Sequence, residues 1–119
     1  MTPEEKTKRA LQVVKATRID MGRSLASMVA YMEQNKIKGE QGDAERCPLA
    51  MTYLKALRPI FRNKKLEVCV DGDTIEITVA GEQVLSIPAT ALEKRFIDKF
   101  DDADDEGNVT YPQLMKVHR

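Results

Sequence analysis

The pattern of apolar and polar positions changes its period once along the chain, near Leu66. Before this point, apolar residues recur three and four positions apart, as they do on the buried face of an amphipathic helix. Residues that commonly begin helices stand ahead of these segments, namely Pro3, Ser24 and Pro48. We therefore predict three helices, over about residues 2–17, 24–32 and 48–58.

Beyond this point, apolar and polar residues alternate with the period of half-buried strands. Three such runs are joined by short glycine-containing turns, which predicts a three-stranded antiparallel meander over residues 66–87. Pro88 ends the sheet, and Thr90 with Glu93 forms the capping-box pattern that begins a helix over residues 91–100. The prediction is an α+β fold with N-terminal helices, this meander and a C-terminal helix, which we expect to pack on the sheet.

Length and composition are typical of one globular domain. The chain has 119 residues, of which 42% are hydrophobic and 32% are charged, whereas disordered chains are poorer in hydrophobic residues. We expect a single domain over residues 1–119. Its helical part covers about residues 1–63, and the sheet with its helix covers about residues 64–119.

The first residues are polar and charged, where a signal peptide would be apolar. No apolar stretch approaches the roughly twenty residues that cross a bilayer. We therefore expect a cytoplasmic protein with no membrane partner. Its two cysteines, Cys47 and Cys69, are then reduced thiols, and both are predicted to pack in the core.

Residue types that carry most enzyme chemistry are scarce in this chain. The single histidine, His118, lies next to the C-terminus, where chain ends are often frayed, so a catalytic triad is not expected. Two cysteines and one histidine do not supply four zinc ligands at the usual spacing, and no phosphate-binding glycine loop occurs. We expect a protein that is not an enzyme, with no catalytic residues, no metal site and no cofactor.

One acidic stretch resembles a degenerate calcium-binding EF-hand loop. The residues at loop positions 1, 3, 5, 6, 7 and 12 are Asp102, Asp104, Glu106, Gly107, Asn108 and Gln113. Position 12 needs a carboxylate that binds calcium through both oxygens, and a glutamine cannot supply one. Two interpretations stay open, a calcium-responsive module and an acidic helix end in solvent.

A longer resemblance covers about residues 47–114. It is carried by the run CPLAMTYL that begins at Cys47, by Leu85-Ser86-Ile87-Pro88, and by the run FIDKFD that begins at Phe96. These segments resemble small uncharacterised proteins of actinobacteria and their bacteriophages. The resemblance implies a cytosolic accessory or regulatory protein, encoded by a bacterium or a phage, that acts by binding. It assigns no functional residue.

Charge is divided unevenly along the chain. Residues 1–65 hold 14 Lys or Arg and 7 Asp or Glu, a net +7, whereas residues 66–119 hold 5 and 12, a net −7. The total is therefore zero. Five cations gather at the end of the third predicted helix and beyond it: Lys55, Arg58, Arg62, Lys64 and Lys65. An acidic run follows later, over residues 98–106.

Two arrangements of these charged segments are open. If they face one another, they form a solvated internal pair that contributes little to stability. If they lie apart, the five cations are free to attract an acidic partner. We predict the second arrangement and a small, non-enzymatic protein-binding or regulatory accessory protein. The alternatives are a nucleic-acid-binding module that uses the same cations as phosphate contacts, and the calcium-responsive module.

Overall fold

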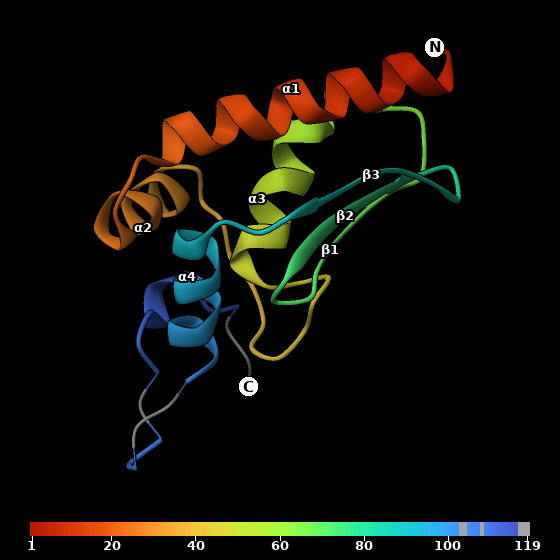
Figure 1. Ribbon diagram of the computed structural model, residues 1–119. Helices are drawn as coiled ribbons and strands as arrows, with labels where there is room; N and C mark the ends of the chain where they lie inside the picture. The colour runs from red at the N-terminus through yellow and green to blue at the C-terminus, as the bar shows by residue number, and fades with distance from the viewer. Residues whose placement is uncertain (103–104, 108, 117–119) are drawn as a thin grey trace.

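Three helices form the first half of the computed structural model, which describes residues 1–102, 105–107 and 109–116 (Figure 1). They are α1 (Pro3–Met21), α2 (Leu25–Gln34) and α3 (Pro48–Leu57). Thr2 and Ser24 cap α1 and α2 through their side-chain oxygens, so the predicted helix starts are confirmed. α1 runs one turn beyond its predicted end, because no helix-breaking residue occurs before Gly22, whose φ is 81°.

The predicted meander is confirmed. Its strands are antiparallel and lie in chain order, as β1 (Leu66–Val70), β2 (Thr74–Val79) and β3 (Glu82–Pro88). Alternate residues of β1 and β2 are buried, and Val68 pairs with Ile77. The intervening side chains, such as Glu67 and Cys69, are on the opposite face of the sheet and are partly exposed.

α1 and α3 are the helices that cover the sheet. α3 packs against β1, and α1 crosses α3 and packs along β3 (Figure 1). The Thr7 hydroxyl of α1 donates a hydrogen bond of 2.7 Å to the carbonyl of Val84 in β3. One edge of the sheet is therefore covered by a helix, and β1 forms the other edge.

The C-terminal helix α4 (Ala91–Asp101) begins with the predicted capping box of Thr90 and Glu93. It packs against α2 rather than across the sheet, so the expected packing on the sheet is wrong. Phe96 of α4 stacks on Tyr111, with ring centroids 5.6 Å apart, and the residues that follow Tyr111 pack against α2, so this aromatic contact holds α4 beside α2. A short 3-10 turn, η1 (Pro112–Leu114), follows and also packs against α2.

Buried side chains from the helices and all three strands form one hydrophobic cluster. Cys47 belongs to it, as predicted, but Cys69 does not. The prediction for Cys69 is wrong because the strand period places its side chain on the open face of the sheet, opposite its neighbour Val68. Within the described residues, no helix combines the length and the apolar character needed to cross a membrane.

Candidate functional site

The five cations predicted to bind a partner are all exposed. Lys55 and Arg58 lie on and just after the last turn of α3, and the other three lie in the segment that leads to β1. Within the described part of the chain, none of the five forms an ion pair with a carboxylate. Lys55 Nζ donates instead to the carbonyl of Asn35 at 2.6 Å.

These cations do not face the described part of the acidic run, which is residues 98–102, 105 and 106. The segment 58–65 lies at the upper end of α3, whereas α4 ends at the opposite side of the molecule (Figure 1). Beside that end of α4, a separate hollow of about 380 Å³ is lined by four aspartates, Asp43, Asp71, Asp98 and Asp101. The basic segment and the hollow lined by aspartates are therefore separate regions of the surface.

The structure assigns Lys55 and Arg58 to a groove along the outward face of α3. Two adjoining hollows make up this groove, an upper one of about 420 Å³ and a lower one of about 550 Å³. They share an apolar floor, Met51 and Leu54, and a cationic wall, Lys36 and Lys38. We call the two hollows together the α3 groove.

The rim of the α3 groove is basic. Its six cations are Lys36, Lys38, Arg46, Lys55, Arg58 and Lys116. Its three carboxylates are Glu40, Glu45 and Glu67, which leaves a formal charge of 6 − 3 = +3. The upper hollow holds no carboxylate among the described residues that line it. Such a surface favours an anionic ligand that also has apolar side chains.

The wall opposite α3 is held by backbone contacts. Gly39 donates its N–H to the carbonyl of Leu114 at 2.8 Å, and its own carbonyl accepts from the N–H of Lys116 at 2.9 Å. A Cβ atom at Gly39 would lie only 2.5 Å from the backbone nitrogen of Pro48, so the position requires glycine. These contacts hold the segment that carries Lys38 close to Pro48, the first residue of α3.

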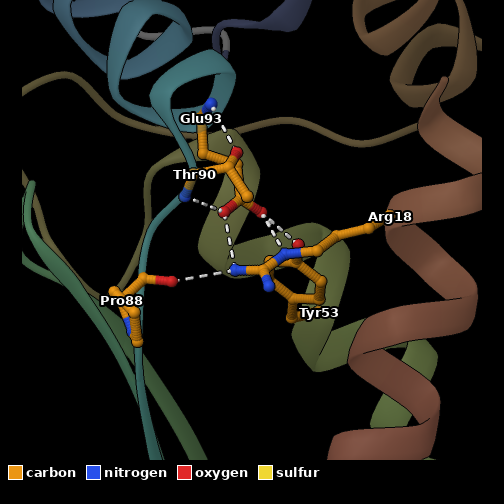
Figure 2. Close-up of polar contacts among 5 residues, drawn as sticks. All are labelled: Arg18, Tyr53, Pro88, Thr90 and Glu93. Carbon is orange, nitrogen blue, oxygen red and sulfur yellow. Dashed lines mark hydrogen bonds and ion pairs between the residues drawn. The ribbon is translucent and has the colours of Figure 1, made fainter. Parts of the chain in front are cut away.

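A buried polar network holds α3 against its neighbours from the inside (Figure 2). The Glu93 carboxylate, 2% exposed, accepts hydrogen bonds from the N–H of Thr90 at 2.8 Å and from Nη2 of Arg18 at 2.8 Å. It also accepts from Nε of Arg18 at 3.2 Å and from the hydroxyl of Tyr53. One carboxylate therefore links α4, α1 and α3.

Among the described residues, no buried side-chain nitrogen or oxygen lacks a hydrogen-bond partner. Arg18 Nη2 also donates to the carbonyl of Pro88 at 3.1 Å, and burial with the neighbouring carboxylate of Glu93 raises the pKa of the Tyr53 phenol. The phenol therefore remains a donor at neutral pH. Since the carboxylate is fully bonded and nearly inaccessible, we assign the network to holding the fold and not to a reaction.

The sequence pattern did not reveal most of these residues. Only the capping-box role of Glu93 was predicted, because Arg18 and Tyr53 reach it from distant parts of the chain. The groove had one local signal, since Met51, Leu54, Lys55 and Arg58 are spaced i, i+3, i+4 and i+7 on one helical face. The contribution of Lys36 and Lys38 depends on how the segment after α2 folds back, which local periodicity does not indicate.

The predicted calcium loop is only partly described. Asp104 and Asn108 lie outside the described residues, and Gly107 has a φ of 85°. Among the residues that the structure covers, no group of three or more His, Cys, Asp or Glu side chains could hold a metal ion. Calcium binding by this loop therefore stays an untested alternative.

Comparison with protein-family models, curated proteins and solved structures finds no match to this chain. The resemblance to small actinobacterial and phage proteins stays a prediction. Functional inference therefore depends on the geometry and charge of the α3 groove.

Proposed function

We propose that this protein is a non-enzymatic protein-binding module, of accessory or regulatory type, that holds an acidic segment of another protein in the α3 groove. The observation that carries the proposal is the combination of an apolar floor with a rim of net charge +3. Apolar contacts supply most of the affinity at an interface, and complementary charge supplies specificity and rapid association. An acidic segment with apolar side chains matches both properties.

The backbone at Lys36 gives further support. Lys36 has a φ of 57°, in the left-handed region that costs a non-glycine residue about 1–2 kcal/mol. Glycine would fit this position with less strain, and strained residues are frequent at binding sites. The strained residue places a cation on the wall that both hollows share. Binding by this cation offers a reason for lysine at a position that favours glycine.

The test compares two charge reversals of equal size. Lys36→Glu with Arg58→Glu alters the α3 groove, whereas Arg62→Glu with Lys64→Glu alters exposed residues that line neither hollow. Each pair lowers the formal net charge by 2 × 2 = 4. The probe is a 12-residue peptide selected from a displayed random library on the immobilised full chain, with affinity measured by fluorescence anisotropy at 150 mM salt.

We expect the groove pair to weaken the selected peptides at least tenfold and the control pair to change their affinity less than threefold. Equal losses in both pairs would show a general charge effect and contradict the proposal. A duplex DNA of about 20 base pairs serves as competitor. Tight DNA binding that survives 200 mM salt would favour the nucleic-acid alternative, because a few phosphate contacts alone weaken steeply with salt.

A further inference from the structure

The outer edge of β1 carries backbone groups that point away from the sheet. The carbonyl of Lys65 accepts from the N–H of Ala80, so the odd-numbered residues of this strand bond to β2. The N–H and C=O groups of the even-numbered residues therefore point outward. Val70 confirms this direction, because its N–H donates to the carbonyl of Ala44 at 2.8 Å, in the loop before α3.

Leu66 and Val68 each carry an outward N–H and C=O, and the carbonyl of Val70 is the one further outward group of β1. Within residues 1–102, 105–107 and 109–116, nothing forms a hydrogen bond to these groups on the outer side. The two residues are only 6% and 3% exposed, and both line the lower hollow of the α3 groove. Unpaired backbone groups are rare when they are buried, because each one loses its bonds to water without replacement. Two such residues, facing one hollow, indicate a missing hydrogen-bonding partner.

The other edge of the sheet differs in this respect. There, the hydroxyl of Thr7 donates to the carbonyl of Val84, and the guanidinium of Arg18 donates to the carbonyl of Pro88. Both donors come from α1, which covers that edge. The unpaired backbone groups of Leu66 and Val68 adjoin the α3 groove, whereas two outward carbonyls of β3 are occupied by side chains of α1.

We propose that the acidic segment binds in extended form and adds to β1 as a fourth strand. This inference rests on the proposed function, and it specifies the conformation and side-chain pattern of the partner. Addition of a strand to a sheet edge supplies main-chain hydrogen bonds, here to Leu66 and Val68, while pockets select the side chains. Since Ala44 already occupies the N–H of Val70, pairing is confined to a stretch of about three residues, or roughly 10 Å.

The register of β1 defines the pattern of the segment. Residues opposite Leu66 and Val68 direct their side chains toward α3 and the apolar floor of the groove. The residue between them lies opposite Glu67, on the open face, where a second carboxylate would be repelled. The expected segment therefore has two apolar residues separated by one residue that is not acidic. Carboxylates on either side of this triplet reach the cations of the rim.

The test uses a selected 12-residue peptide and a scan of single N-methyl groups along its backbone. Only the paired triplet contacts β1, and the N–H groups of its two outer residues face the strand, so methylation should weaken binding at least tenfold at these two positions and less than twofold at the residue between them. The protein variant Val68→Pro removes an outward N–H without removing a bond to β2, and it should weaken binding by a similar factor. A melting curve checks that this variant folds; the methyl scan does not depend on it.

Amide signals of the isotope-labelled chain give the second readout. Strand addition predicts that the amides of Leu66 and Val68 shift downfield and exchange more slowly when the peptide binds. A methyl scan with no alternation, together with unchanged signals at these two residues, would overturn strand addition. A different result would contradict the proposed function, namely an unchanged peptide affinity when the charges of Lys36 and Arg58 are reversed.

Discussion

Replacing Arg18 by methionine leaves the buried carboxylate of Glu93 without its countercharge. The methionine keeps the apolar stem of the side chain in place but removes both hydrogen bonds from the guanidinium to Glu93, of 2.8 and 3.2 Å, and the one to the carbonyl of Pro88. Two neutral donors remain, the N–H of Thr90 and the hydroxyl of Tyr53. A charge in an environment that is 2% exposed is then only partly compensated.

The expected cost follows from the burial of the two partners. Removing one member of a buried ion pair costs about 3–5 kcal/mol, because the other charge remains without a partner. The Arg18 side chain is 25% exposed, so solvent already screens part of the pair, and we take the lower limit, about 3 kcal/mol. In a chain of this length such a loss lowers the melting temperature by roughly 10 °C.

The double variant Arg18→Met with Glu93→Gln tests the reason for that loss. Glutamine keeps an oxygen that can accept from Thr90, and it removes the unpaired charge. We expect the double variant to recover about 1 kcal/mol or more relative to Arg18→Met alone, measured by urea unfolding monitored by circular dichroism. A loss below 1 kcal/mol for Arg18→Met would refute the assignment of Glu93 as a charged partner of Arg18. So would a double variant whose loss equals the sum of the losses of Arg18→Met and Glu93→Gln alone.

Four further predictions concern other parts of the chain. Lys36→Gly should raise the free energy of unfolding by about 1 kcal/mol and weaken peptide binding, and a binding affinity equal to that of the parent would contradict the role of this cation. Ala80→Asn should stabilise by about 0.5 kcal/mol in urea unfolding, because Ala80 and Gly81 both have positive φ, as in a type I′ turn that prefers Asn-Gly. Burial raises the pKa of the Cys47 thiol from 9.0 to about 11, so the folded state keeps a proton that the unfolded chain releases. Stability should therefore fall by up to about 2 kcal/mol between pH 9 and 11, and Cys47→Ser should remove that part of the slope. Millimolar calcium should leave the melting temperature unchanged, whereas a calorimetric titration with a micromolar dissociation constant would establish a site in the loop 102–113.

Local patterns were sufficient to predict the elements of this fold. A helix start depends on residues within one turn of the chain, so it can be predicted from the local sequence. This applies to the starts at Pro3, Ser24 and Pro48 and to the capping box at Thr90. The meander follows from a period of two and from short turns in the same way. Packing between elements was harder to predict from the sequence, since the position of α4 depends on contacts with α2 and with Tyr111.

The binding surface could be predicted only in part. Charge along the sequence left open whether the cations face the acidic run; the structure shows that Lys55 and Arg58 are exposed, as predicted, and that α4, which begins the acidic run, ends on the other side of the molecule. The groove itself needs Lys36, Lys38 and the edge of β1, which come together through long-range contacts such as the bridge between Gly39 and Met115 and the hydrogen bond from Val70 to Ala44. A contact between residues so distant in sequence has no local signal.

The most direct measurement of the central claim uses methionine methyl groups as reporters. Met51 lies on the floor of the α3 groove, whereas Met28 and Met32 are buried in the core. The chain is labelled with 13C at the methionine methyl groups and titrated with a selected acidic peptide in a two-dimensional carbon–proton NMR experiment. Binding in the groove predicts a saturable shift of the Met51 signal, with little change at Met28 and Met32. Saturable binding that leaves the Met51 signal in place would contradict the assignment of the α3 groove as the binding site.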